Sequence, residues 1–446
     1  MIRILQILLA FVVTNFFFWP FETTALPGIN TKMMLAVLGL LFAAVEFGRR
    51  KDMEIPRELV FLFLLAGAVS LASLISITLN QTPDSTYVSY VISFSVWLSA
   101  AFATCCVIRW AHGRIGVQLV LDYLVAASLV QCILALVLDA YPALAHWINS
   151  RTYFGQDVAL RVKRLYGIGA LLDVAGLRMA AVLTGLSYYL SEIDGRLHPT
   201  RRISYIICFA AISVVGNMIA RTALVGVCLG LGFMLLVFLF KPSEPGSGEK
   251  TPIFLSWFGI MLATIVVCVL LYNGNPAARK LFRFAFEGFF SLAEKGYWEV
   301  DSNEILKNMI VFPETLHTWI LGDGYFMNSR YDINYLGDST DQGFYMGTDV
   351  GYLRFIFYFG FLGLIPMFGV ILYSAVVCMR HFRREKAFFL LALLVGVTVW
   401  FKVSTDIFLY FALFLSAAAL QTDEDPVYHS GPVPAGGDGA YPIAQS

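Results

Sequence analysis

The sequence has little charge of either sign, and this scarcity argues against a soluble protein. Asp, Glu, Lys and Arg make up only 14% of the 446 residues, whereas an average soluble domain carries about 25%. The 31 basic and 31 acidic side chains cancel. The basic excess typical of nucleic-acid-binding proteins is therefore missing, and we expect no nucleic-acid partner. Hydrophobic residues make up 58% of the chain, which predicts an integral membrane protein.

The sequence also lacks a cysteine framework, a signal-peptide cleavage site and a nucleotide-binding glycine loop. All seven cysteines fall in apolar runs, so we expect small buried hydrophobic residues rather than disulfides or zinc ligands. No small-x-small site follows the first apolar run, which predicts a retained membrane span. A single Glu-x-x-His pattern, Glu314 with His317, is too weak to indicate a metal. We expect no metal and no cofactor.

Twelve apolar runs are separated by charged or Pro/Gly-rich breaks. A helix needs about 20 mostly apolar residues to cross about 30 Å of hydrocarbon. The runs cover residues 3–19, 31–47, 59–79, 87–109, 116–138, 174–190, 203–219, 222–240, 253–273, 350–379, 387–401 and 405–420. The last two are separated by few polar residues, so a single bent helix is the alternative there. The predicted fold class is an all-α polytopic membrane protein with about twelve transmembrane helices.

Basic residues collect in alternate short loops and so predict the orientation. Short cytoplasmic loops carry the excess of Lys and Arg, and the even-numbered loops hold it here. Both termini are therefore expected in the cytoplasm, and the two long loops, residues 139–173 and 274–349, are expected to face outward. Residues 1–420 form the predicted membrane-embedded domain. The Pro/Gly-rich tail, residues 421–446, is predicted to be disordered.

Four basic side chains lie within or at the ends of apolar spans on the outward half: Arg178, Arg221, Arg354 and Lys402. Each costs about 2.5 to 3.5 kcal/mol at the centre of a lipid-facing helix, so each needs a partner or a wet cavity. The structural alternative to a binding site is snorkelling to the interface, or pairing with Asp173, Asp349 or Asp406.

The long loops carry further basic residues: Arg151, Arg161, Lys163, Arg164, Arg279, Lys280, Arg283, Lys295, Lys307 and Arg330. A solvated surface explains any one of them, and an interfacial belt explains the many loop aromatics. Residues 281–290 are predicted as a surface helix with Arg283 and Glu287 on its wetter side. Together, an outward basic cavity flanked by lipid suits an anionic head group on a hydrocarbon tail. The hypothesis is a polyprenyl-diphosphate-linked substrate.

Asp349 stands at the junction of the second long loop and the tenth span, five residues before Arg354. Glycosyl transfer onto a hydroxyl needs a base near the acceptor and positive charge near the leaving diphosphate. If the helix begins near Thr348, that residue is its N-cap and Asp349 is an ordinary first-turn acid. Catalysis and helix capping are therefore both open interpretations of Asp349.

At these residues the chain resembles the bacterial O-antigen polymerases of the Wzy type, which are related to the O-antigen ligases. The resemblance covers the overall layout and several short motifs: RLYGIG at residues 164–169 followed by Gly176 and Arg178, RTAL at 221–224, LGDGYF at 321–326, TDVGY at 348–352, and Lys402. It implies a metal-independent membrane glycosyltransferase at the outer face of the bacterial inner membrane. Such enzymes join oligosaccharide repeat units carried on undecaprenyl diphosphate into O-antigen, capsule or exopolysaccharide.

The resemblance also implies roles for residues and partners. Asp349 becomes the candidate base, and the substrate-binding candidates are Arg164, Arg178, Arg221, His317, Tyr352, Arg354 and Lys402. The expected partners are the lipid-linked oligosaccharide, membrane lipid, a chain-length regulator and a flippase. In the ligases a histidine-containing motif stands where this chain has Thr348 and Asp349, which favours a polymerase. A ligase, a flippase or other transporter, and a structural membrane-assembly protein remain alternatives; long outer loops and no visible repeat favour an enzyme over a transporter.

Overall fold

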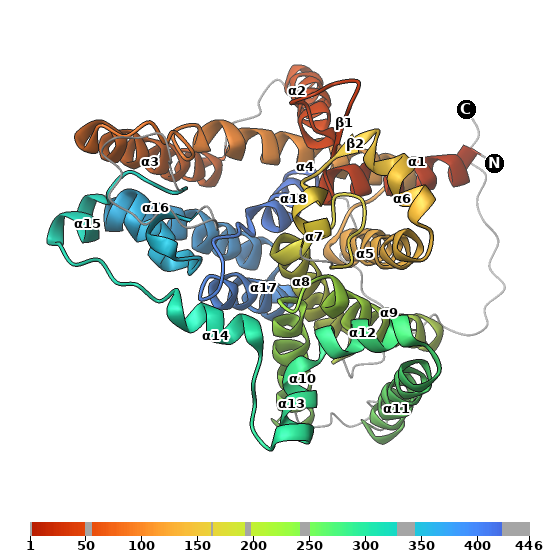
Figure 1. The fold of residues 1–446 in the computed structure, drawn as a ribbon. Coiled ribbons are helices and arrows are strands. Elements are labelled where there is room, and N and C mark those ends of the chain that lie inside the picture. The colour runs from red at the N-terminus through yellow and green to blue at the C-terminus, as the bar shows by residue number, and fades with distance from the viewer. Residues whose placement is uncertain are drawn as a thin grey trace, which may run out of the picture.

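The computed structural model describes residues 2–49, 56–161, 164–191, 198–240, 250–327 and 344–421 (Figure 1). All twelve predicted spans are helices: α1 (Ile2–Phe18), α2 (Thr31–Arg49), α3 (Arg57–Asn80), α4 (Tyr90–His112), α5 (Val117–Ala140), α8 (Leu172–Leu190), α9 (Pro199–Ile219), α10 (Ala223–Phe240), α11 (Lys250–Gly274), α16 (Gly351–His381), α17 (Lys386–Val399) and α18 (Phe408–Leu420). In the described chain, seven helices are long and apolar enough to cross a membrane: α3, α4, α5, α9, α10, α11 and α16. The prediction of an all-α polytopic membrane protein is confirmed. The predicted disordered tail after Gln421 lies outside the described residues.

The long loops contain short elements of their own: α6 (Pro142–Asn149), α7 (Gln156–Arg161), α12 (Pro276–Ala285), α13 (Glu287–Lys295), α14 (Asp301–Asn308), α15 (Leu316–Leu321) and the 3-10 turn η1 (Tyr345–Gly347); a second such turn, η2 (Arg383–Glu385), precedes α17. Two short strands, β1 (Glu22–Thr23) and β2 (Thr152–Tyr153), pair antiparallel. The predicted single surface helix over residues 281–290 is wrong, because the chain breaks at Phe286 between α12 and α13.

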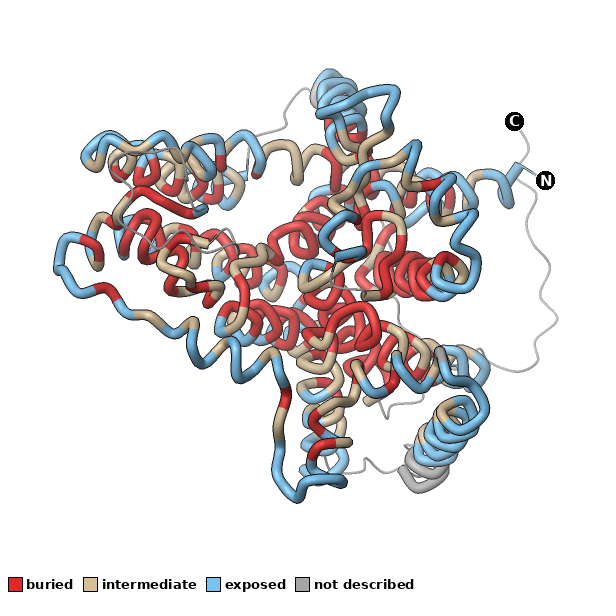
Figure 2. The backbone as a smooth tube through the Cα atoms, viewed as in Figure 1, coloured by how far each residue is buried: buried red, intermediate tan, exposed pale blue. Residues whose placement is uncertain are grey.

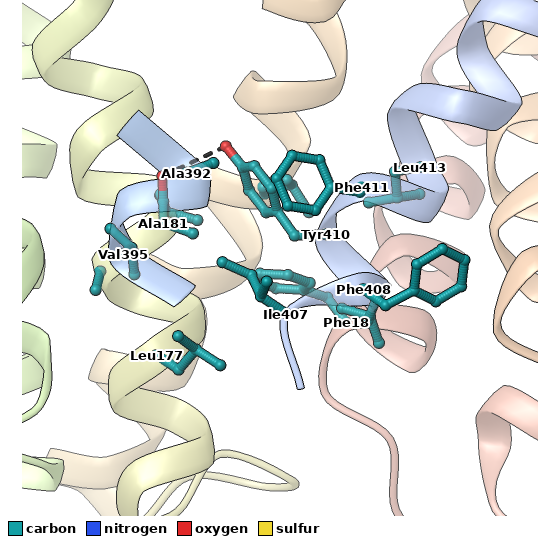
Figure 3. Packing of buried hydrophobic residues seen from close by; sticks show 14 of the residues in the cluster. Phe18, Leu177, Ala181, Ala392, Val395, Ile407, Phe408, Tyr410, Phe411 and Leu413 are labelled. Atoms are coloured by element: carbon teal, nitrogen blue, oxygen red, sulfur yellow. Dashed lines mark hydrogen bonds between the residues drawn. The ribbon is translucent and has the colours of Figure 1, made fainter. Parts of the chain in front are cut away.

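The core forms around α8, which contacts α5, α9, α10 and α17. Figure 2 shows this central region buried, whereas α11 is exposed at the edge of the molecule. The small residues of α10 allow the close approach: a Cβ on Gly226 would lie 2.3 Å from Cα of Ala180. Gly226 and Gly230, a pair of small residues four positions apart, therefore allow close helix packing. At the other side of α8, the hydroxyl of Tyr410 donates to the carbonyl of Ala181 at 3.3 Å (Figure 3).

Three of the seven cysteines are buried, three are half-buried and one is exposed. All seven are free, and Cys105, Cys132 and Cys378 are buried. The expectation of burial is wrong for Cys228, which is exposed. It lies on α10, a helix that buries only Ala223, Gly226 and Gly230.

The helix α16 is broken at Gly360, where φ is +60°. The break frees carbonyl groups that the loop segment 322–324 binds: Asp323 N–H donates to Phe357 O at 2.6 Å, and Gly324 N–H to Tyr358 O at 3.1 Å. A Cβ on Gly360 would lie 2.3 Å from the carbonyl of Ile320, so glycine is required for this contact. The predicted span over residues 350–379 is thus two helical pieces joined at a docking point for the LGDGYF motif.

The chain between α17 and α18, residues 400–407, is not helical. Two helices are therefore confirmed, and the alternative of one bent helix is wrong. The start of α16 packs on this connection, because Tyr352 N–H donates to Trp400 O at 3.3 Å. A Cβ on Gly351 would lie 2.6 Å from Val403 O, which explains the glycine of the TDVGY motif. The α17–α18 connection and the N-terminal end of α16 are held together as one unit.

Candidate functional site

The α17–α18 connection supplies three alternate polar residues that reach three different helices. Lys402 pairs with Asp173 at the start of α8, and Ser404 accepts a hydrogen bond from Arg354 of α16. Asp406 accepts one from the Tyr90 hydroxyl of α4 at 3.1 Å. Because residues 400–407 are not helical, this short segment can contact helices from distant parts of the sequence. This set of contacts forms the candidate site.

The first ion pair of the site joins Lys402 Nζ to Asp173 Oδ1 at 3.0 Å. The Thr222 hydroxyl, just before α10, also donates to Asp173 and lies 3.4 Å from Lys402 Nζ. Gly176 permits this approach, because a Cβ there would lie 2.7 Å from Cβ of Thr222. Both charged side chains are mostly buried, with 29% and 22% exposed. The interpretation of Lys402 as an acid-paired residue is correct.

The second ion pair joins Arg354 Nη1 to Asp349 Oδ1 at 3.2 Å. The same nitrogen donates to Ser404 Oγ at 3.0 Å, and Nη2 donates to Phe326 O at 3.3 Å. The guanidinium also lies 3.8 Å from the ring centroid of Phe326. Only 8% of the Arg354 side chain is exposed. Asp349 neutralises the charge of Arg354, and the ring of Phe326 adds a cation–π contact.

Asp349 lies before α16 rather than in its first turn. The helix begins at Gly351, so the expectation that Thr348 is its N-cap is wrong. Thr348 Oγ1 instead accepts from Val350 N–H at 3.3 Å in a local turn. Burial raises the pKa of Asp349 to about 6, with Arg354 opposing the shift and Asp173 adding to it. The carboxylate is therefore mostly ionised at neutral pH and more basic than an ordinary aspartate, which suits general-base chemistry.

Arg221 and Arg164 lie beside the first ion pair and share one aromatic ring. Their guanidinium carbons lie 4.3 and 5.1 Å from the ring centroid of Phe284, which belongs to α12. Arg221 also forms an ion pair with Glu287 at 2.5 Å. Glu287 thus faces the interior, not the wetter side that the sequence predicts. Arg221 and Glu287 line a cavity of about 400 Å³ beneath α12 and α13.

Arg178 lies in a different aromatic setting. It donates through Nη1 to the carbonyl of Phe18, and its guanidinium carbon lies 5.6 Å from the ring of Trp19 and 5.9 Å from that of Trp97. Lys32 Nζ lies 3.5 Å from the same Trp97 ring. Lys32 is absent from the predicted set. The signal that could have found it is the one used for the others, a basic residue at the end of an apolar span.

Two predicted site residues lie apart from these contacts. His317 Nε2 is 3.0 Å from Asn80 Oδ1 on an exposed surface between α15 and α3. Tyr352 donates its hydroxyl to Val397 O at 3.0 Å, and its ring packs edge-on against Trp400. Lys163 and Arg330, among the loop residues expected to line a basic cavity, lie outside the described residues.

Comparisons with known proteins do not assign this site. The chain matches no protein-family model, no curated protein and no solved structure. The geometry itself defines a mostly buried centre of two ion pairs in a membrane protein. The pKa of one of its two carboxylates, Asp349, is raised to about 6.

Proposed function

We propose that the protein is a membrane glycosyltransferase that polymerises polyprenyl-diphosphate-linked oligosaccharide repeat units into a surface polysaccharide. The observation that carries the proposal is Asp349: a carboxylate with 25% of its side chain exposed, held by Arg354, with a pKa of about 6. In this proposal the site faces outward from a bacterial inner membrane and both termini are cytoplasmic. The resemblance of the short motifs to those of the Wzy-type polymerases supports the same proposal.

The proposed reaction assigns each group a simple task. Asp349 accepts the proton of the acceptor hydroxyl as that oxygen attacks the anomeric carbon of the donor. The bond between the anomeric carbon and the diphosphate oxygen breaks, and the diphosphate leaves with the electron pair. Fixed cations near the leaving group stabilise its developing charge, which is most effective where water is scarce. Arg354 orients Asp349 through their ion pair.

A genetic experiment tests the proposal. The gene is deleted in its host, the lipid-linked glycans are extracted, and chain lengths are compared after complementation with wild type, Asp349→Asn or Asp157→Asn. Asp157 lies exposed on α7 and serves as the matched control. We expect single repeat units to accumulate in the deletion strain. Wild type and Asp157→Asn restore long chains, whereas Asp349→Asn, at equal protein level, slows polymerisation by at least about 100-fold.

Other outcomes decide between the alternatives. Full-length polymer retained on the lipid carrier in the deletion strain indicates a ligase, and repeat units trapped at the cytoplasmic face indicate a flippase. Normal chain lengths with Asp349→Asn contradict the role of Asp349 as the base.

A further inference from the structure

The charges of the two ion pairs in the candidate site cancel. Arg354 is paired with Asp349, and Lys402 with Asp173. A diphosphate that approached these cations would meet the two carboxylates that already neutralise them. Arg221 is in the same position, because Glu287 pairs with it. None of these three basic residues therefore offers uncompensated positive charge to an anion.

Lys32 and Arg178 differ from them. Within the described part of the chain, neither has a carboxylate at ion-pair distance, and both are half-buried. The acid that acts electrostatically on Lys32 is Asp406, whose oxygens accept hydrogen bonds from Tyr90 and from Phe408 N–H. Of the five N–H donors on the Arg178 guanidinium, one has an acceptor among the described residues, Phe18 O.

The placement of these two cations is unfavourable without an anion. Arg178 acts electrostatically on Lys32, and both lie against the Trp97 ring. Two like charges repel each other strongly where little water screens them. Lys32 also lies in the first turn of α2, where the helix dipole disfavours a cation. An anion between the two side chains would relieve both costs and would use the open Arg donors.

We propose that Lys32 and Arg178 bind the diphosphate head group of the substrate. This inference rests on the proposed function and assigns its leaving group to a pair of residues outside the Asp349 ion pair. Asp406 links the Lys32–Arg178 pair to the candidate site. It acts electrostatically on Lys32 and lies on the same α17–α18 connection as Lys402 and Ser404. Asp349 then acts on the acceptor, while Lys32 and Arg178 hold the donor.

An apolar cavity that shares Trp19 with the surroundings of Arg178 suits the hydrocarbon part of such a lipid. The cavity has a volume of about 610 Å³ and is lined by side chains of α1, α5, α6 and the segment that follows α1, among them Phe16, Trp19 and Leu134. Trp19 contacts both regions, because its ring also lies 5.6 Å from the guanidinium of Arg178. A lipid diphosphate with its head group at Arg178 and its chain passing Trp19 would pair its phosphates with the guanidinium and bury its hydrocarbon in the apolar cavity.

A binding experiment with the full-length protein in detergent or nanodiscs tests this assignment. Farnesyl diphosphate, inorganic diphosphate and farnesol are titrated by calorimetry into wild type, Lys32→Gln and Arg178→Gln. The matched control is Lys307→Gln, at an exposed lysine of α14. The double variant Asp173→Asn/Lys402→Gln tests the rival assignment, because it removes a cation of the candidate site without changing the net charge. Melting temperature and elution profile report whether each variant is folded.

We expect each of the two single variants to weaken farnesyl diphosphate binding by at least about tenfold, and Lys307→Gln to stay within about threefold of wild type. The affinity for farnesol, which has no diphosphate, should not depend on Lys32 or Arg178. If inorganic diphosphate binds as tightly as farnesyl diphosphate, the anion site is supported, but its ligand is free diphosphate rather than a lipid head group. If the neutral double variant loses binding while Lys32→Gln and Arg178→Gln retain it, the assignment is overturned and the proposed function stands. If wild type binds no diphosphate at all, the proposed function itself fails.

Discussion

Two groups of basic residues occupy similar positions at the ends of apolar helices, yet the fold treats them differently. Arg354 and Lys402 each meet a carboxylate from another element and further hydrogen-bond partners. Lys32 and Arg178 meet aromatic rings and a backbone carbonyl instead. The comparison separates two uses of buried positive charge. A paired cation holds helices together, whereas in our proposal an unpaired cation is available to bind an anionic ligand.

The largest expected difference is in stability. Arg354→Met leaves Asp349 unpaired in a mostly buried place, so we expect the free energy of unfolding to fall by about 4 kcal/mol. Arg178→Met leaves no carboxylate unpaired, and we expect a loss of less than about 1 kcal/mol. Denaturation of the two variants in the same detergent measures the difference. Equal losses would show that Arg178 has a structural role like that of Arg354.

A double-mutant cycle sharpens the same contrast. Asp173→Asn and Lys402→Met should each destabilise the fold by about 3 kcal/mol, because each leaves a charge without its partner. The double variant should lose less than the sum of the two, giving a favourable coupling of about 2 kcal/mol. The corresponding cycle with Lys32→Met and Arg178→Met should give a small coupling of the opposite sign, about 0.5 kcal/mol. Additive losses at Asp173 and Lys402 contradict a cooperative ion pair.

The proposed function predicts a pH dependence of polymerisation. Burial raises the pKa of Asp349 to about 6, above the usual value of about 3.9, and in the proposed reaction this base must be ionised. The rate should therefore fall about tenfold for each pH unit below 6. The contribution of Asp349 to the free energy of unfolding changes with pH in the opposite direction to the rate. It is complete below about pH 4 and is lost as the pH rises through about 6. Rates of purified protein between pH 4.5 and 8 test this, and a constant rate down to pH 4.5 would exclude Asp349 as the base.

Local sequence signals predict the helices and the three acids that are available to pair with the buried cations, but they do not assign an acid to each cation. Hydropathy is a property of neighbouring residues, so all twelve apolar runs were found as helices. Asp349 and Arg354 are close in sequence, and their pairing was one of the weighed alternatives. The positions of Gly322 and Gly360 were not interpretable beforehand, because their tight contacts join a loop to a helix break elsewhere in the chain.

Long-range partners could not be predicted from the same signals. The sequence predicts a wet helix face for Glu287, because no residue near it in the chain indicates that Glu287 pairs with Arg221. Lys32 resembled any basic residue at a membrane interface until α2 and α4 brought Trp97 beside it. The charge balance of a buried cluster depends on tertiary packing, and this is why the open pair of cations emerges only in three dimensions.

The smallest expected effect concerns Thr222, whose hydroxyl donates to Asp173. Thr222→Val keeps the shape but removes this hydrogen bond, so we expect a loss of about 1 kcal/mol in the free energy of unfolding. Thr222→Ser keeps the donor and should retain most of the stability. Thr104→Val is the control, because Thr104 is also buried but donates within its own helix to Ala100 O. Since Lys402 also contacts Thr222, Thr222→Val should lower the coupling between Asp173 and Lys402, whereas Thr104→Val should leave that coupling unchanged. An unchanged coupling in Thr222→Val would restrict the paired centre to its two charges.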